Sequence, residues 1–323
     1  PGPSGNSPTN AKQPVQLTLV SYAVTQSAYS KIIPKFVGQW QAKTGQTVTF
    51  NQSYGGSGSQ TRAVIDGLEA DVVALALALD TQKIEKAGLI QPGWEKEFPN
   101  DSKVTKSVVA LVTREGNVKV SKWSDLANKD VKVITANPKT SGGARWNFLA
   151  LWGSVTQAGG SQEAAADYVT KVYKNVPVLP KDAREASDVF YKQGQGNVLI
   201  NYENEVLLAK QKGEARPYFV PTDYNISIDS PVAVVDANVD KHGTREVAAA
   251  FVKFLFTPES QRAFAQAGFR PVDETVAAEF ASQHPKIQHL FTVQDLGGWD
   301  KVQSEFFEDG AIFDQIQAKI AKS

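Results

Sequence analysis

The chain has 323 residues, of which 41% are hydrophobic and 10% aromatic, and this length predicts two domains of ordinary size instead of one core. Its 34 basic and 34 acidic residues cancel, which argues against a nucleic-acid partner or a polybasic membrane surface, because both need an excess of Lys and Arg. No apolar run approaches the roughly 18–20 residues that span a bilayer.

Cys and Met are both absent from the sequence. Without Cys the protein can form no disulfide, no Cys-ligated zinc site and no thiol nucleophile. The missing initiator Met indicates a processed form, so we expect that a signal peptide has been removed.

The predicted elements begin after residues 1–14, a stretch rich in Pro, Gly, Ser and Asn that we expect to be a disordered tail. A first strand over Val15–Val20 leads into a helical pattern that reaches Lys43. Pro34 lies inside this pattern. Because proline in mid-helix costs about 3 kcal/mol, we expect a break at Ile33 or a new helix with Pro34 in its first turn.

Strands alternate with helices along the rest of the chain, which predicts an α/β fold whose parallel-rich sheets carry helices on their faces. A strand over Ser107–Thr113 is expected to cross between the two domains, and Ser124 is a suitable N-cap for a short helix. The last segment, residues 281–323, has a mostly helical pattern. In folds of this kind the ligand lies beyond the carboxyl ends of the strands.

Two loops rich in Gly and Ser follow predicted strands. Residues 52–60 come after a strand over Val48–Phe50, and residues 137–145 come after a strand over Val131–Ile134; each loop leads into a helix. The first N–H groups of a helix have no partner inside the helix, and the macrodipole adds partial positive charge there. Each loop is therefore a candidate anion site, and two such loops suggest two lobes that face one ligand.

The residues Asn-Pro-Lys-Thr-Ser-Gly-Gly-Ala-Arg at 137–145 resemble the signature of the bacterial sulfate-binding proteins, the periplasmic receptors of sulfate ABC importers. The resemblance runs from about Val15 to about Ile316. Its further blocks are Lys43–Gly45, Asn51–Gly58, Glu69–Val73, Tyr202–Glu205, Gly297–Trp299 and Phe313–Ile316. A protein made in quantity during sulfur starvation would do well to contain no sulfur, which offers one explanation for the missing Cys and Met.

The resemblance implies a two-lobed periplasmic-binding-protein fold of type II, with the ligand cleft between the lobes. Lobe one would comprise residues 15–106 and 225–280, lobe two residues 107–224, and the C-terminal helices of residues 281–323 would pack on one lobe. It also implies that the lobes close around sulfate in the periplasm and deliver it to the subunits of a membrane ABC permease. We expect a monomer without cofactor or metal, and a lipid anchor on a removed N-terminal segment stays open.

In this family the sulfate is held by backbone N–H groups, Ser hydroxyls and an indole N–H, without a cation in contact. The resemblance assigns the ligand to Ala23, Ser57, Ser141, Gly142, Gly143, Ala183 and Tyr202. Backbone N–H donation falls to Ala23, Gly142, Gly143 and Ala183. Hydroxyl donation falls to Ser57 and Ser141, with the Ser57 N–H as a further donor.

Two of these positions depart from the family. Ala23 stands where relatives usually carry Asp, which keeps the N–H and removes a carboxylate near the dianion. Tyr202 stands where relatives carry Trp, and its phenol could admit a protonated ligand because it accepts as well as donates. Arg62, Arg145 and Arg184 lie just inside helices that begin at candidate loops, and we expect them to brace the loops without touching the ligand.

The hydrogen-bonding groups of the two loops also favour sulfate on physical grounds. Sulfate carries no proton at neutral pH and needs donors only, whereas monohydrogen phosphate also needs an acceptor, and a buried unused acceptor costs about 1–3 kcal/mol. The two loops contain no Asp or Glu, which favours sulfate. Asp182 and Glu203 lie near the predicted site in sequence, and we interpret them as helix caps or interlobe hydrogen-bond partners.

Other ligands and an enzyme remain as alternatives. Thiosulfate has a charge and shape similar to those of sulfate, and molybdate, tungstate or phosphate would use the same fold. A phosphoryl-handling enzyme is remote, because the first loop lacks the Gly-Lys-Ser/Thr of a P-loop and such an enzyme would need a carboxylate for Mg²⁺ nearby. The histidines, His242, His284 and His289, all lie in the last third of the chain, far from both loops in sequence.

Overall fold

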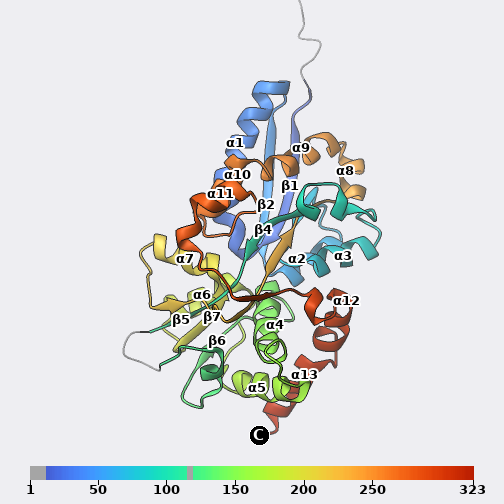
Figure 1. The fold of residues 1–323 in the computed structure, drawn as a ribbon. Helices are drawn as coiled ribbons and strands as arrows, with labels where there is room; N and C mark the ends of the chain where they lie inside the picture. Colours follow the sequence, from blue (N-terminus) through green and yellow to red (C-terminus); the bar gives the residue numbers. More distant parts are fainter. Residues whose placement is uncertain (1–11, 115–118) are drawn as a thin grey trace, which may run out of the picture.

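The computed structural model describes residues 12–114 and 119–323. Figure 1 shows two bodies, one above the other, each built around its own sheet, and we call them the first and second lobe. Most of the expected disordered tail lies outside the described residues. None of the helices in the described ranges is long and apolar enough to cross a membrane.

The first lobe contains a four-stranded sheet in the order β11-β3-β1-β2. Its strands are β1 (Val15–Tyr22), β2 (Val48–Gly55), β3 (Val72–Ala74) and β11 (Ala233–Val234). β1 runs parallel to both β2 and β3, whereas β11 is antiparallel to β3. The helices of these chain segments are α1 (Gln26–Thr44), α2 (Ser57–Ile65), α3 (Ala78–Lys86), α8 (Asp236–His242), α9 (Arg245–Leu255), α10 (Pro258–Gln266) and α11 (Glu274–Glu279).

The second lobe contains another four-stranded sheet, in the order β6-β7-β5-β8. Its strands are β5 (Val109–Thr113), β6 (Val133–Ile134), β7 (Val198–Tyr202) and β8 (Tyr218–Phe219). β6 is parallel to β7, but β5 is antiparallel to β7 and β8, so this sheet is mixed within an α/β fold that is otherwise as predicted. The helices of this segment are α4 (Gly142–Thr156), α5 (Gln162–Lys174), α6 (Ala183–Tyr191) and α7 (Glu203–Gln211).

Two further pairs of strands lie where the chain passes between the sheets. β4 (Lys103–Ser107) is antiparallel to β10 (Ile228–Pro231), and β9 (Tyr224–Ile226) is parallel to β12 (His289–Phe291). The single crossing strand expected over residues 107–113 is wrong in detail, because β4 and β5 are separate strands that pair with different partners. The side chain of Asn225 holds the crossing together, since it accepts from the N–H of Val109 at 3.0 Å and donates to the Val109 carbonyl at 2.9 Å.

The C-terminal segment packs mainly on the second lobe. α13 (Ile312–Ala321) lies against α5, and α12 (Trp299–Val302) reaches α3 of the first lobe. Figure 1 shows this segment running down the side of α4 and α5. Phe148 of α4 is the centre of the contact, with the rings of Phe306 and Phe307 at 5.5 and 5.4 Å between centroids.

Two local predictions about helices are wrong. α1 runs without a break through Pro34, because it buries Ile32, Ile33 and Phe36 against the core, and this burial outweighs the loss of one backbone hydrogen bond. Ser124 lies inside a short 3₁₀ helix, and Lys122 occupies the N-cap position without a side-chain cap.

Candidate functional site

The N-terminus of α4 is built by the loop that follows β6. The carbonyl of Asn137 accepts hydrogen bonds from the N–H groups of Thr140 and Ser141 at 3.1 and 2.8 Å, which turns the chain into the helix. Ser141 is the N-cap, and its hydroxyl oxygen accepts from Ala144 N at 3.2 Å. Because that oxygen accepts here, its own proton is free for another partner.

Gly142 and Gly143 are the first two residues of α4, so their N–H groups have no acceptor within the helix. A Cβ on Gly142 would lie 2.5 Å from Cβ of Ala76 in the first lobe. A Cβ on Gly143 would lie 2.8 Å from Cε2 of Tyr202 and 3.2 Å from Cβ of Ala183. Only glycine permits this close approach, and it brings the start of α4 against both the first lobe and α6.

The N-terminus of α2 belongs to the first lobe and contacts the second lobe. Gly58 N and Ser59 N donate to the carbonyl of Thr140 at 3.1 and 3.4 Å, so the two lobes are in contact here. Ser57 begins the helix. Its hydroxyl donates to Asp80 Oδ2 at 2.6 Å and accepts from Ala76 N at 3.0 Å.

The structure pairs the Ser57 hydroxyl with Asp80, and its donation to a ligand stays a prediction. A hydroxyl has one proton, and here that proton goes to Asp80. The backbone N–H of Ser57, at the first position of α2, stays a predicted donor.

Asp80 was missed because the segment around it shows none of the Gly and Ser residues that mark the other loops. Asp80 lies in the first turn of α3, after β3. This further succession of strand, loop and helix was the sequence signal that could have pointed to it.

α6 supplies a third helix N-terminus. Asp182 is its N-cap and accepts from Glu185 N at 2.8 Å, which confirms the interpretation of Asp182 as a helix cap. Ala183 is the first helical residue and lies beside Gly143. The starts of α2, α4 and α6 therefore lie close together, and each adds a positive dipole end at this place.

Tyr202 and Ala23 are the remaining residues of the predicted ligand site. The ring of Tyr202 packs against Gly143 and lies 5.9 Å from the ring of Tyr22, the residue before Ala23. Tyr202 is 2% exposed, and its hydroxyl has no hydrogen-bond partner among the residues that the structure describes. Burial above all, and then the neighbouring Tyr22 and Asp80, raise the pKa of Tyr202 well above its ordinary value, so the phenol keeps its proton and can donate.

The arginines near the loops have protein partners. Arg62 donates to the carbonyl of Lys139 in the second lobe at 3.3 Å. Arg145 donates to the carbonyl of Pro138 at 2.9 Å, within its own loop. Arg184 forms a bidentate pair with Glu205 at 2.6 and 3.1 Å.

Glu203 forms an ion pair that links distant parts of the chain. It is fully buried, and its carboxylate accepts from Arg270 at 2.7 and 2.9 Å. Arg270 follows α10 of the first lobe, whereas Glu203 begins α7 of the second. The interpretation of Glu203 as an interlobe partner is thus confirmed.

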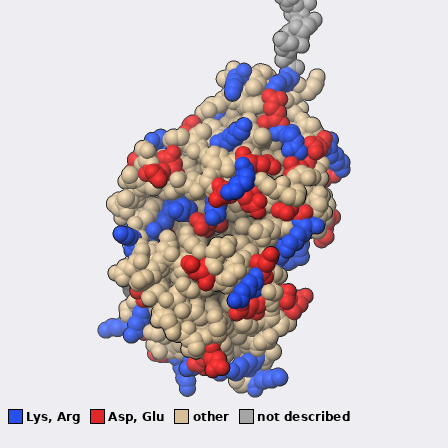
Figure 2. Space-filling model, turned by 45° about the vertical axis from the view of Figure 1, so that its right-hand side comes forward, with Lys and Arg blue, Asp and Glu red and all other residues tan. Residues whose placement is uncertain are grey.

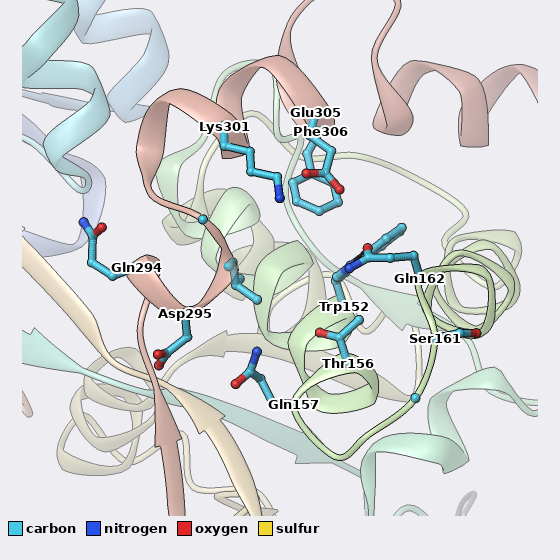
Figure 3. A pocket seen from close by; sticks show the side chains of 13 residues that line it. Trp152, Thr156, Gln157, Ser161, Gln162, Gln294, Asp295, Lys301, Glu305 and Phe306 are labelled. Carbon is cyan, nitrogen blue, oxygen red and sulfur yellow. Dashed lines mark hydrogen bonds between the residues drawn. The ribbon is translucent and has the colours of Figure 1, made fainter.

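A separate hollow lies away from these helix starts. It has a volume of 520 Å³ and lies between the end of α4 and the C-terminal segment. Figure 3 shows Lys301, Glu305 and Phe306 on one side and Trp152 and Gln157 on the other. No helix N-terminus of the predicted site lines it, so it is distinct from the anion site. On the face shown in Figure 2, Lys and Arg are interspersed with Asp and Glu.

The fold defines the class of the protein. Two α/β lobes, joined by crossing strands and meeting through helix N-termini, are the architecture of periplasmic-type solute-binding proteins. Residues 17–270 match the family described as bacterial extracellular solute-binding protein, and the chain belongs to this family. Within it, the chain is a member of the sulfate-binding proteins, as the sequence resemblance predicted.

The relatives give this membership its detail. The sulfate-binding protein of Synechocystis sp. is 68% identical over 97% of this chain and 90% of its own. The thiosulfate-binding protein of Pseudomonas aeruginosa is 37% identical over 95% of this chain and 93% of its own. The solved structure of the sulfate-binding protein SubI from Mycobacterium tuberculosis matches with a TM-score of 0.83 and 37% identity, over 91% of this chain and 100% of that one. All three are named as binding proteins.

Proposed function

We propose that this protein binds sulfate with high affinity in the periplasm and delivers it to an ABC-type sulfate permease, without catalysing a reaction. The observation that carries the proposal is the meeting of the α2, α4 and α6 N-termini, whose first N–H groups have no acceptor inside their helices. Donors without a fixed cation suit a dianion that must be released again. The names of the relatives support the same ligand.

The ligand is held by hydrogen-bond donors from both lobes. The proposed donors are the N–H groups of Ala23, Ser57, Gly142, Gly143 and Ala183 and the hydroxyls of Ser141 and Tyr202. Arg62, Arg145 and Arg184 brace the surrounding loops through the partners described above and do not touch the ligand.

Closure of two lobes encloses the ligand, and the permease receives it when they open. The lobes comprise residues 15–106 with 225–280 and residues 107–224, with residues 281–323 packed as C-terminal helices. The contact between the α2 start and the Thr140 carbonyl forms on closure and breaks on opening. The protein acts as a monomer.

Thiosulfate is the second candidate ligand. It has the same charge as sulfate and a similar tetrahedral shape, and one relative, 37% identical to this chain, is named a thiosulfate-binding protein. The phenol of Tyr202 in place of an indole changes one of the proposed donors and is the residue to examine for this preference.

A calorimetric titration of ligand-stripped protein tests the proposal. Sulfate, thiosulfate, phosphate and molybdate are titrated in turn at pH 5, 7 and 8. We expect tight binding of sulfate with a similar dissociation constant at each pH, because sulfate does not titrate in this range. If thiosulfate binds more tightly than sulfate, thiosulfate becomes the proposed ligand. If no oxyanion binds, the proposal is overturned.

A further inference from the structure

The loop that leads into α4 carries a lysine whose charge is held by the C-terminal segment. Lys139 Nζ donates to Asp314 Oδ2 at 2.9 Å and to the carbonyl of Phe307 at 3.2 Å, and Asp309 Oδ1 lies 3.4 Å away. All three of these acceptors lie in residues 303–314. A lysine just before the Ser141 cap is thus tied to a segment that supplies none of the proposed ligand donors.

Arg145, the other basic residue of the 137–145 stretch, contacts the same segment. It is 6% exposed. It donates to Gln303 Oε1 at 2.9 Å, and its guanidinium carbon lies 4.8 Å from the centroid of the Phe307 ring. Because Arg145 also donates to the carbonyl of Pro138, Phe307 contacts the loop twice, through its carbonyl at Lys139 and through its ring at Arg145.

The chain at this contact has an unusual backbone conformation. Residues 303–307 follow α12 and form one turn of π-helix, which is rare and occurs often at functional sites. The N–H of Glu308 donates to the Gln303 carbonyl at 2.9 Å and closes this wide turn. The last carbonyls of a helix have no donor within it, so the Phe307 carbonyl is available to Lys139.

Asp314 is the carboxylate that holds Lys139 most firmly. The side chains of Lys139 and Asp314 are 30% and 34% exposed, whereas Asp309 is fully exposed. Asp314 Oδ2 also accepts from Gly310 N at 2.8 Å, which fixes the position of the carboxylate. Exposed ion pairs contribute little because water competes for both charges, so Asp314 is a stronger anchor than Asp309.

The other side of the same loop contacts the first lobe. The carbonyl of Lys139 accepts from Arg62, and the carbonyl of Thr140 accepts from Gly58 N and Ser59 N. The main chain of the loop therefore lies against the first lobe, while the side chain of Lys139 reaches the C-terminal segment.

We propose that Lys139 and Asp314 are positioning residues of the anion site, through which the C-terminal segment holds the start of α4 in its ligand-binding geometry. This inference rests on the proposed function. Donors that are already held in place lose less freedom when a ligand binds. Loss of the anchor therefore weakens binding, although no ligand donor is removed.

The substitution Asp314→Asn tests this role, because it removes the charge and keeps an acceptor for Gly310 N. Sulfate is titrated by calorimetry at pH 7.5 into the wild type, Asp314→Asn, Lys139→Met and the double variant. Glu308→Gln is the matched control, since Glu308 is an exposed carboxylate of the same segment. The melting temperature without ligand and the hydrogen exchange of backbone amides are measured for each protein.

We expect Asp314→Asn to weaken sulfate binding by about 3–10-fold, with Glu308→Gln within about twofold of the wild type. The sign is informative, because removal of a negative charge should by itself favour a dianion. The double variant should bind within about twofold of Lys139→Met, since the two residues act through one contact. Amide exchange should become faster in residues 137–145 and stay unchanged in α7, with the melting temperature lowered by less than about 3 °C.

Two other roles of these residues predict different results. If Lys139 itself contacts the anion, Asp314→Asn releases it and sulfate binding is unchanged or tighter. If the contact only stabilises the fold, exchange becomes faster in α7 as well and the melting temperature falls clearly. Either result would overturn the inference and leave the proposed function intact.

If Asp314→Asn does not fold, Asp314→Ser takes its place, and the same loss of sulfate affinity is required. A wild type that does not bind sulfate would remove the proposed function together with this inference.

Discussion

The N-termini of α2 and α4 begin with similar runs of Gly and Ser, yet their polar groups have different partners. At α4 the Ser141 hydroxyl accepts a hydrogen bond from Ala144 N and keeps its proton. At α2 the Ser57 hydroxyl gives its proton to Asp80. The second and third N–H groups of α2, from Gly58 and Ser59, are also occupied, because they donate to the Thr140 carbonyl of the opposite lobe.

A helix N-terminus is therefore not a ligand site by composition alone. One start, that of α4, keeps its first N–H groups and a hydroxyl proton for a ligand, whereas the other uses most of its donors to hold the lobes together. A count of donors must therefore subtract those that the protein has already used. The substitutions below separate the two roles.

The largest effect is expected at the α4 start, with Gly142→Asp. A Cβ at this position would lie 2.5 Å from Ala76 Cβ and 3.0 Å from Ser57 Cβ, and the new carboxylate would face the dianion. Sulfate affinity should fall by at least about a thousandfold, as measured by calorimetry. Gly38→Asp is the matched control, because a Cβ on Gly38 of α1 meets no atom within 4 Å. Unchanged sulfate affinity in Gly142→Asp would remove this site.

A smaller effect is expected from the two serines, and its asymmetry tests the comparison directly. Ser141→Ala removes a free O–H donor and the cap of α4, so sulfate affinity should fall about 10–100-fold and stability by about 1 kcal/mol. Ser57→Ala keeps the backbone N–H and removes a hydroxyl that serves Asp80, so sulfate affinity should change by less than about threefold. Calorimetry and urea unfolding of both variants supply these values.

Equal losses of sulfate affinity in the two serine variants would contradict the comparison. They would mean that the Ser57 hydroxyl turns from Asp80 to the ligand on binding, as the sequence resemblance first implied. Both variants should lose stability, so a loss of stability alone cannot distinguish the two roles.

The smallest effect is expected from Tyr202→Phe, which removes a buried hydroxyl without a described partner. Leaving such a group unsatisfied costs about 1–3 kcal/mol, so the variant without ligand should be as stable as the wild type or slightly more so. Sulfate affinity should fall about 3–10-fold, because a donor is lost. Thermal unfolding and calorimetry should thus move in opposite directions, and a parallel loss of stability and affinity would show that the hydroxyl is structural.

The sequence predicts the parts of this molecule that local patterns determine. The helix start at residues 137–145, the cap at Asp182 and the alternation of strands and helices all follow from short stretches of chain. The loop predicted over residues 52–60 is wrong in extent, because β2 runs to Gly55 and α2 begins at Ser57, so that only Gly56 separates them. The family resemblance, carried by residues 137–145, adds the two-lobed fold, which composition and periodicity do not show. The assignment of individual ligand donors stays a prediction.

The parts that the sequence does not predict depend on partners that are distant in the chain. Asp80 is unremarkable in sequence, and only folding brings it to Ser57 across an intervening strand. The unbroken course of α1 through Pro34 depends on contacts such as that of Phe36 with Phe251, whose ring centroids are 5.2 Å apart. Local propensity cannot weigh such burial against the lost hydrogen bond.

The contact between the lobes at Thr140 uses main-chain atoms on both sides, since one carbonyl receives the amides of Gly58 and Ser59. A side-chain latch could be deleted by one nucleotide change, but a latch made of peptide groups persists through most substitutions. Its vulnerability lies in proline, which lacks the amide proton, and in bulk at Gly56 and Gly58, where an added Cβ would meet the Thr140 carbonyl. Most substitutions near this contact can therefore change the side chains of the loops and leave the contact between the lobes in place, provided that Gly56 and Gly58 remain.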